Sequence, residues 1–433
     1  MPPETALRED ARQRIAEIKN AALPSAQSAS AQPQPTEVIL TGIPSYNNET
    51  TIAHVVRSAA EGMVRHFPNL KPVVINSDGG SSDGTRRRVL ATEVPPGVEV
   101  ISTQYLGVSG KGSSFRAIFE AARQLGARAC VVVDSDLRSI TPQWINLLAS
   151  PIIDQDYDYV TPNYTRHKYD GTITNNITFP MTRMLYGLEV RQPIGGDFGF
   201  SGRLVETYLE RGDWDSDMAR YGIDIWMTTT AINESGRVCQ ARLGAKVHDA
   251  KDPAAALGPM FVQVVGTLFT LMQTYQDRWK DVSSVSTAPI YGPEADDEPD
   301  PVPVSVPAMI GKLHTGAEEH QGMWQRVLSP ESQETLASIL AQSEADYRFP
   351  AANWARMVLD FAVAYNKRGS CRDLTASPDE IISAMTPLYY GRTASLAIES
   401  GDMDTATFEQ QIVRHQALEF EKLKPYLKRR WDE

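Results

Sequence analysis

Residues 127–137 read Ala-Arg-Ala-Cys-Val-Val-Val-Asp-Ser-Asp-Leu. The apolar run in this stretch is continuous rather than alternating, which predicts a strand buried on both faces, as in a parallel sheet. Asp134 and Asp136 follow at the point where that strand leaves the sheet. Ligands of open α/β sheets bind at the carboxyl ends of the strands. The two aspartates are therefore candidate ligand-binding residues.

The aspartate pair has two interpretations. Two neighbouring carboxylates repel each other unless a cation or a proton lies between them, and a hard divalent cation prefers oxygen ligands. Alternatively, the tripeptide is a turn followed by a helix cap, because Asp favours both positions. The tripeptide alone leaves both interpretations open, so the rest of the sequence has to separate them.

Composition limits the class of protein. The chain has 433 residues, enough for two or three domains, and 42% hydrophobic with 22% charged residues is normal for a soluble globular enzyme. The net charge is −12 and the sequence has no long Lys/Arg cluster, so we expect no binding to nucleic acid. Three widely spaced cysteines indicate neither a disulfide framework nor a zinc site, and they favour a reducing cytoplasm.

We expect a cytoplasmic protein without a membrane span. The chain does not open with the basic, apolar and small-residue pattern of a signal peptide. The most apolar helix candidate, residues 260–275, is interrupted by Gln263 and Gln273 and is too short to cross a bilayer.

Strands and helices alternate from residue 37 onward. The patterns predict strands at 38–42, 72–76, 98–103, up to 134, 159–163 and 238–245, with helices between most of them. This rhythm predicts an α/β fold with a mostly parallel twisted sheet and helices on both faces.

Four regions follow from the composition along the chain. They are an N-terminal helix with a flexible linker (1–36), an α/β domain (37–280), an acidic, proline-containing linker (281–305) and a helical C-terminal region (306–433). The helical region either completes the core, the more frequent role of apolar helical stripes, or serves in dimerisation or as a lid. We expect a homodimer.

Two loops at strand ends carry groups suited to a nucleotide. Residues 43–49, Ile-Pro-Ser-Tyr-Asn-Asn-Glu, follow the first strand and precede a helix. Helix N-termini attract anions, and Asn and Tyr can bond a base or a ribose. Asp78 ends the second strand and can accept hydrogen bonds from the same groups. The alternatives are an Asn-rich helix cap and a plain loop.

Two further motifs add a cation and an imidazole. Gly110-Lys111-Gly112 allows close backbone approach and places a positive charge where a diphosphate would lie. The P-loop pattern and a Gly-x-Gly-x-x-Gly after the first strand are both absent from the sequence, which argues against those two classes of nucleotide site. His248 follows a strand, and it becomes a metal ligand only if the fold brings it to Asp134 and Asp136.

The order of these motifs resembles the GT-A fold of nucleotide-sugar-dependent glycosyltransferases. More closely, the sequence resembles the retaining family that contains the glucosyl-3-phosphoglycerate and mannosylglycerate synthases. The resemblance covers roughly residues 37–280. It rests on Asp134-Ser-Asp-Leu137 with Ile140-Thr-Pro-Gln-Trp144, Pro193-Ile-Gly-Gly-Asp197, Tyr221-Gly-Ile-Asp224 and Lys246-Val-His248.

The resemblance implies a donor half at about 37–140 and an acceptor half at about 141–280. Donor-binding positions would be Pro44, Tyr46, Asn47, Asn48, Asp78, Lys111, Asp134 and Ser135. Asp136 would ligate a divalent metal, Mg²⁺ or Mn²⁺, most directly, with His248 as the second ligand. Asp134 would contact the ribose or reach the metal through water.

On the acceptor side, Gly171, Thr172 and Thr174 match the segment that binds the acceptor's carboxylate or phosphate. The glucosyl branch of the family often has Arg where Thr172 stands, so Arg166 and Lys168 are candidates to supply that charge. The Gly-Gly-acid motif beside the transferred sugar and the acceptor would be Gly195, Gly196 and Asp197.

The implied function is transfer of glucose or mannose from a nucleoside-diphosphate sugar to D-glycerate or 3-phosphoglycerate, in compatible-solute synthesis. The donor stays open among UDP-glucose, ADP-glucose and GDP-mannose. Retention by a front-face path needs no protein base, whereas double displacement needs a carboxylate about 3 Å from the anomeric carbon, for which Asp197 and Asp224 are candidates. Asp224 alternatively binds sugar hydroxyls or caps its helix. A transferase with a polysaccharide or lipid acceptor and a non-catalytic nucleotide-sugar-binding protein are the alternative functions.

Overall fold

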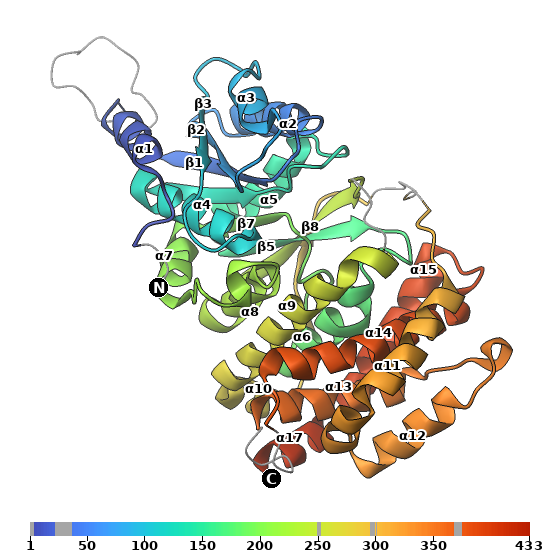
Figure 1. The fold of residues 1–433 in the computed structure, drawn as a ribbon. Coiled ribbons are helices and arrows are strands. Elements are labelled where there is room, and N and C mark those ends of the chain that lie inside the picture. Colours follow the sequence, from blue (N-terminus) through green and yellow to red (C-terminus); the bar gives the residue numbers. More distant parts are fainter. Residues whose placement is uncertain (1–3, 22–36, 249–252, 295–298, 300, 368–374) are drawn as a thin grey trace. The chain divides into compact units, whose positions relative to one another are not determined.

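The computed structural model describes residues 4–21, 37–248, 253–294, 299, 301–367 and 375–433 (Figure 1). The chain divides into two compact units. The described residues within 1–165, 194–249 and 288–299 form unit 1, and those within 166–193, 250–287 and 300–433 form unit 2. Two segments that the sequence places in the α/β domain, 166–193 and the described residues 253–280, thus belong to unit 2.

Unit 1 is built on an eight-stranded sheet with the order β10-β8-β5-β7-β4-β1-β2-β3. Every neighbouring pair is parallel except those of β7, which runs antiparallel to β4 and β5. The predicted mostly parallel sheet is confirmed. The strands are β1 (Val38–Ser45), β2 (Lys71–Asp78), β3 (Glu99–Gln104), β4 (Ala127–Val132), β5 (Tyr159–Thr165), β7 (Phe198–Ser201), β8 (Val238–Ala245) and β10 (Ile290–Tyr291).

Helices cover both faces of this sheet, as predicted. They are α1 (Glu9–Ala21), α2 (Ile52–His66), α3 (Thr85–Leu90), α4 (Lys111–Leu125), α5 (Pro142–Gln155), α7 (Gly202–Arg211) and α8 (Ile223–Glu234), with a short turn η2 (Asp217–Ala219). Ile39 and Ile43 of β1 pack in one core with α2 and α5, which lie against each other. Gly42 points the other way, and a Cβ there would lie 2.5 Å from Ile118 of α4. Successive residues of β1 therefore face opposite sides of the sheet, and each side is covered by its own layer of helices.

Strands β7 and β10 of the sheet were not predicted. Residues 290–291 lie in the predicted linker, and residues 194–202 read only as a glycine-rich segment, since glycine weakens strand interiors. In the structure a Cβ at Gly199 would lie 2.0 Å from the backbone oxygen of Leu148 in α5. Glycine is required there because a helix backbone crosses close to the strand, and this reason is not visible in the local pattern.

The donor-side helix α4 begins at Lys111, three residues earlier than the predicted start at 114. The N-terminus of α4 packs against the turn η2. A Cβ at Gly112 would lie 2.0 Å from the backbone oxygen of Met218, so glycine at this position lets α4 start in contact with that turn. Lys111 consequently occupies the first turn of a helix rather than a loop.

Unit 2 is helical, with a small two-stranded sheet of β6 (Leu188–Glu189) and β9 (Ser286–Thr287). Its helical elements are η1 (Thr174–Thr178), α6 (Phe179–Tyr186), α9 (Pro253–Thr274), α10 (Gln276–Asp281), α11 (Val306–Val327), α12 (Pro330–Leu340), η3 (Glu344–Asp346), α13 (Ala351–Asn366), α14 (Pro378–Ser400), α15 (Thr405–Phe408), η5 (Glu409–Val413), α16 (Arg414–Lys422) and α17 (Lys424–Asp432). The predicted helical C-terminal region is confirmed. None of the helices in the described ranges combines the length and the hydropathy needed to cross a membrane.

Two helices of unit 2 are longer than expected from the sequence. The predicted helices at 323–328 and 378–385 correspond to α11 and α14, which extend over 22 and 23 residues. Pro387 lies inside α14, where proline normally ends a helix. In the structure α14 packs along α11, and a Cβ at Gly316 would lie 2.2 Å from Pro387. Packing against α11 thus stabilises α14 beyond the position where local propensity predicts its end.

Candidate active site

A cluster of charged side chains lies at the carboxyl edge of the sheet in unit 1. Asp134 follows β4 and Lys246 follows β8, as expected for residues at the ends of parallel strands. Asp197 precedes β7, and because this strand is antiparallel to β4, its first residues lie at the same edge. The sheet therefore brings together residues that are up to 112 positions apart.

Asp134 is held by two lysines. Its carboxylate lies 2.9 Å from Nζ of Lys111 and accepts a hydrogen bond of 2.8 Å from Nζ of Lys246. Burial by itself would raise the pKa of Asp134, but the two ammonium groups hold that pKa well below its ordinary value. Lys246 is only 4% exposed, so its charge is balanced inside the protein and not by water.

Asp197 is fully buried, and both of its oxygens are engaged. Oδ1 accepts the backbone N–H of Asp134 at 2.8 Å. Oδ2 accepts Nζ of Lys246 at 2.9 Å together with the hydroxyl of Tyr164. Lys246 also donates to the backbone oxygen of Gly195 at 2.9 Å. Asp197 thus holds the Asp134 backbone and the Lys246 ammonium in place.

The two glycines before Asp197 are explained by close packing. Gly196 has φ = +89°, and a Cβ there would lie 2.3 Å from Oδ2 of Asp134. A Cβ at Gly195 would lie 2.0 Å from the ring of Pro162. A side chain at Gly196 would therefore displace Asp134, and one at Gly195 would displace Pro162.

Asp224 completes the cluster from the first turn of α8. Its Oδ1 lies 3.3 Å from Nζ of Lys111, and its side chain is 11% exposed. Burial raises the pKa of Asp224, and the nearby ammonium groups offset this only in part. Burial by itself would lower the pKa of Lys111, but Asp134 and Asp224 raise it above its ordinary value. Three carboxylates face two ammonium groups, so the cluster carries a net charge of −1.

The predicted donor loop after β1 is fixed by its own polar groups. Oδ1 of Asn48 accepts the Ser135 hydroxyl at 2.8 Å and the Tyr46 N–H at 2.9 Å, which joins this loop to the Asp-Ser-Asp segment. Asn47, with φ = 55°, accepts the N–H of Ser82 at 2.9 Å. Tyr46 is 64% exposed, so its ring is open to a ligand.

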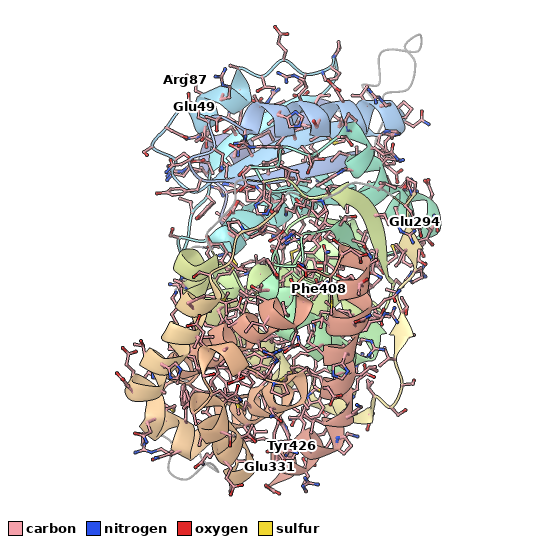
Figure 2. All side chains as sticks on the ribbon, turned by 90° about the vertical axis from the view of Figure 1, so that its right-hand side faces the viewer. Glu49, Arg87, Glu294, Glu331, Phe408 and Tyr426 are labelled. Atoms are coloured by element: carbon pink, nitrogen blue, oxygen red, sulfur yellow. The ribbon has the colours of Figure 1, made fainter. Side chains whose placement is uncertain are left out.

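Asp78 and Pro44 are buried beside this loop. The Asp78 carboxylate accepts hydrogen bonds from the Ser45 hydroxyl at 2.9 Å, from the N–H of Gly80 at 2.9 Å and from the N–H and hydroxyl of Ser81 at 2.8 and 2.6 Å. These bonds shape the turn after β2. The adjoining turn is tied to the first loop by Glu49, which accepts the N–H of Gly84 at 3.1 Å and lies 3.7 Å from Arg87 (Figure 2).

Backbone pairing brings His248 alongside the segment that follows Asp136. The N–H of Arg138 donates to the backbone oxygen of Val247 at 2.9 Å, and the N–H of Val247 donates to the hydroxyl of Ser139 at 3.0 Å. Asp136 and His248 are both half-buried. Within the described part of the chain no three His, Cys, Asp or Glu side chains form a metal-holding group. A carboxylate and an imidazole are suitable ligands for a divalent cation. The remaining ligands of such a cation would come from the substrate or from water.

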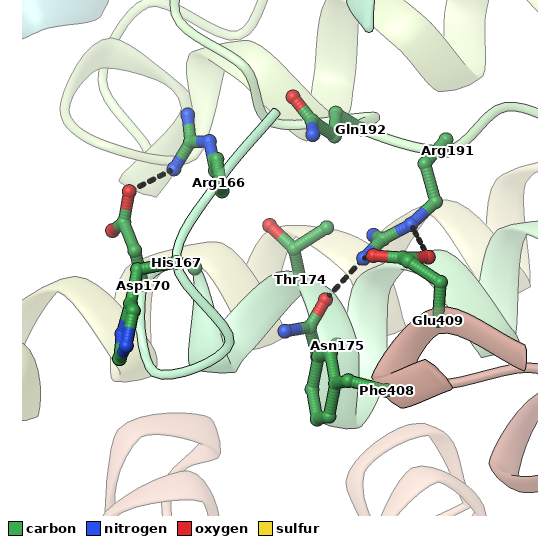
Figure 3. Close-up of a pocket in the computed structure, with 10 residues that line it drawn as sticks. Arg166, His167, Asp170, Thr174, Asn175, Arg191, Gln192, Phe408 and Glu409 are labelled. Atoms are coloured by element: carbon green, nitrogen blue, oxygen red, sulfur yellow. Dashed lines mark hydrogen bonds and ion pairs between the residues drawn. The ribbon is translucent and has the colours of Figure 1, made fainter. Parts of the chain in front are cut away.

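Unit 2 contains a small polar pocket (Figure 3). It is lined by Arg166, His167, Asp170, Gly171, Thr174, Asn175, Arg191, Gln192, Phe408 and Glu409. Arg191 donates to the Glu409 carboxylate from Nε at 2.8 Å and to Asn175 at 2.8 Å, whereas Arg166 contacts Asp170 at 3.4 Å. A pocket with two guanidinium groups is suited to a small polar ligand with an anionic group.

Three of the five predicted acceptor residues that lie in unit 2 line this pocket, namely Arg166, Gly171 and Thr174. The other two point elsewhere. Thr172 is 2% exposed, and its hydroxyl is hydrogen-bonded to that of Tyr389 at 2.5 Å. The ammonium group of Lys168 donates to the backbone oxygens of Ser400 and Met403, so it caps the end of α14.

Sequence reasoning did not assign a role to several charged or polar residues in these two sites, among them Lys246, Tyr164, Arg191 and Glu409. Lys246 could have been predicted from the sequence, because it is the first residue after a strand. Asp134 and Asp136 were predicted as ligand-binding residues because they also follow a strand. Arg191 and Glu409 are 218 residues apart, and no local pattern connects them.

Comparisons with known proteins agree with this fold. The family model described as glycosyl transferase family 2 matches residues 41–207, which run from within β1 to within α7 and end before Asp224, Lys246 and His248. No curated protein matches the sequence.

Two solved structures that resemble the chain are of glucosyl-3-phosphoglycerate synthase from Mycobacterium tuberculosis. One, in complex with Mn²⁺, uridine diphosphate and phosphoglyceric acid, is 23% identical and covers 59% of this chain and 81% of its own, with a TM-score of 0.43. Another, with Mg²⁺ and uridine diphosphate, is 23% identical and covers 59% and 82%, with a TM-score of 0.42. A likeness of this size assigns no substrate to this chain. Residues 41–207 thus match a glycosyl transferase family 2 domain, and the sheet to which they contribute has the mostly parallel topology of a GT-A fold.

Proposed function

We propose that the protein is a metal-dependent retaining glycosyltransferase that moves glucose or mannose from a nucleoside-diphosphate sugar to D-glycerate or 3-phosphoglycerate. The observation that carries the proposal is the buried cluster of Lys111, Asp134, Asp197, Asp224 and Lys246 at the ligand-binding edge of a GT-A sheet. Such a concentration of ionised groups costs folding free energy, and perturbed groups of this kind gather at functional sites.

The donor would bind between the loops that follow β1, β2 and β4. Lys111 lies in the first turn of α4, where the helix dipole and its ammonium group both favour a diphosphate. Asp136 and His248 would hold the divalent ion. When bound, this ion would neutralise the negative charge that grows on the departing nucleoside diphosphate.

The contacts of the carboxylates support a front-face path. Asp197 is fully buried with both oxygens engaged, which leaves neither oxygen available to attack an anomeric carbon. Asp224 is buried with 11% of its side chain exposed, and it lies 3.3 Å from Lys111, so we give it the role of binding sugar hydroxyls while Lys111 faces the diphosphate. The acceptor hydroxyl would pass its proton to the leaving phosphate on the same face, and no protein base would be required.

The acceptor would bind in the pocket of unit 2. Arg166 offers a guanidinium to the acceptor's anionic group, and Gly171 and Thr174 lie beside it.

A matrix of donors and acceptors tests the proposal. UDP-glucose, ADP-glucose and GDP-mannose would each be incubated with D-glycerate or 3-phosphoglycerate and with Mg²⁺ or Mn²⁺. We expect nucleoside diphosphate release that depends on one of these acceptors and a product whose anomeric configuration, read by NMR, is that of the donor. Release that depends only on acceptors other than these two, or an inverted product, would refute it.

A further inference from the structure

The pocket of unit 2 contains one arginine that already binds a carboxylate of the protein. Arg191 donates to both oxygens of Glu409, from Nε at 2.8 Å and from Nη2. The same Nη2 also donates to Asn175 at 2.8 Å (Figure 3). The guanidinium lies 5.1 Å from the ring of Phe179. A bidentate pair of this kind is the geometry in which a guanidinium binds the carboxylate of a ligand. Glu409 therefore occupies the position that a ligand anion would take at Arg191.

The second arginine of the pocket is in a different state. Arg166 contacts Asp170 through Nη1 at 3.4 Å, a length at which a hydrogen bond is weak. An incoming carboxylate can compete with a contact of that length more easily than with the bidentate bonds at Arg191. Asp170 therefore holds Arg166 less tightly than Glu409 holds Arg191.

The charge of the pocket points the same way. Its lining contains two arginines and two carboxylates, Asp170 and Glu409. Burial lowers the pKa of His167, which keeps this imidazole neutral at pH 7. The charges of the lining therefore nearly cancel. A second anionic group on a ligand would meet the carboxylate of Glu409, and the described residues of the lining offer no additional cation to balance it.

The local backbone supports a ligand-binding role for these residues. The described residues include two π-helical turns, η1 and η5, and both border the pocket: Thr174 and Asn175 belong to η1 and Glu409 begins η5. Single π-turns are rare and occur frequently at functional sites, because the extra residue changes the direction of side chains. Here η5 places Glu409 opposite Arg191.

We propose that Glu409, by occupying Arg191, restricts the acceptor to compounds with a single anionic group, so that a free hydroxycarboxylate such as D-glycerate is preferred over its phosphorylated form. This inference deepens the proposed function and rests on it. Glu409 and Arg191 are specificity-determining residues in this view. Thr172 fits the same picture, because this threonine is buried against Tyr389 and adds no charge to the pocket.

The test compares Glu409→Gln with the wild type. The substitution keeps the shape and removes the negative charge, which leaves Arg191 able to bind a second anionic group. We expect the ratio of kcat/KM for 3-phosphoglycerate to kcat/KM for D-glycerate to rise by about tenfold or more, as for a gained charge-assisted hydrogen bond. In the double variant Glu409→Gln with Arg191→Gln, this gain should disappear.

Glu419→Gln is the matched control. Glu419 also pairs with a cation, Lys422 at 2.6 Å, but it does not line the pocket, so the ratio should stay as in the wild type. If Glu409→Gln fails to fold by circular dichroism, Glu409→Asp, which is too short to bind both nitrogens of Arg191, should raise the ratio by a smaller factor.

Failure of the inference and failure of the proposed function give different results. A wild type that prefers 3-phosphoglycerate, or an unchanged ratio in Glu409→Gln, overturns the inference and leaves the proposed function standing. If no acceptor activity is found with either compound, the proposed function fails. Calorimetry then decides the inference separately: D-glycerate should bind the wild type more tightly than 3-phosphoglycerate, and the reverse order would overturn it.

Discussion

Nζ of Lys246 lies 2.8 Å from the carboxylate of Asp134, although the two residues are 112 positions apart in the sequence. The same ammonium group bonds Asp197 at 2.9 Å, so one buried cation joins two carboxylates that follow and precede different strands. Removal of one partner from such a cluster leaves the others with uncompensated charge, and this dependence is the basis of the first prediction.

Lys246→Met should impair both stability and catalysis. Methionine retains the volume and removes the charge, so Asp134 and Asp197 would face each other without the cation between them. We expect a loss of about 3 kcal/mol or more in the free energy of unfolding, and a fall in kcat of about a hundredfold. Urea denaturation and steady-state kinetics measure the two effects.

Lys280→Met, which removes an exposed ion pair with Asp432, is the control and should change neither the stability nor kcat by much. Unchanged catalysis in a folded Lys246→Met would contradict a role for the cluster.

Asp224→Asn should make the protein more stable at neutral pH and less active. Burial raises the folded-state pKa of Asp224, so this residue contributes stability only when protonated. That contribution is full below the ordinary Asp pKa of about 3.9, and it is lost as the pH rises through the raised folded-state value. The Asn variant does not titrate and avoids the penalty of a buried charge. Urea denaturation at several pH values should show a variant that is more stable than the wild type at pH 8, with the difference shrinking toward pH 4. A variant that is less stable at pH 8 would show that the contact with Lys111 outweighs the burial of the charge.

Removal of the metal should abolish transfer reversibly. If Asp136 and His248 hold the ion, EDTA should stop product formation, and excess Mn²⁺ or Mg²⁺ should restore it. His248→Ala should raise the metal concentration for half-maximal activity by about tenfold or more, and Asp136→Ala should be inactive at any metal concentration. His54→Ala, on the exposed side of α2, provides the control. Full activity in EDTA would exclude the metal from the mechanism.

Gly196→Ala should reduce stability and activity more than an alanine substitution at another glycine with positive φ. Gly196 and Gly126 have φ of +89° and +64°, so alanine strains the backbone at both, by about 1–2 kcal/mol. At Gly126 no atom lies within 4 Å of the added Cβ, whereas at Gly196 the Cβ would lie 2.3 Å from Asp134. Thermal unfolding and kinetics on both variants separate strain from contact. We expect loss of activity only in Gly196→Ala, and equal activity in the two would show that the position of Asp134 is not critical.

The sequence determined the fold class and the edge of the sheet that carries the site. The continuous apolar run of β4, the alternation of strands and helices, and acids directly after strands are local properties, and each has a fixed consequence for chain direction. The parallel sheet, the place of Asp134 and Asp136 and the helical C-terminal region were therefore predictable. The local signals failed where glycine or proline was interpreted without its packing partner, as at Gly199 in β7 and Pro387 in α14.

Only the tertiary structure decided which charged groups meet. Lys246 bonds Asp134 and Asp197, and Arg191 bonds Glu409 at a separation of 218 residues. It also decided that Thr172 is buried against Tyr389 while Arg166 lines a pocket. The physical reason is that an ion pair depends on the distance and the burial of both partners. These quantities are set by the packing of whole elements, whereas the residue type and its position along a strand are fixed by the sequence itself.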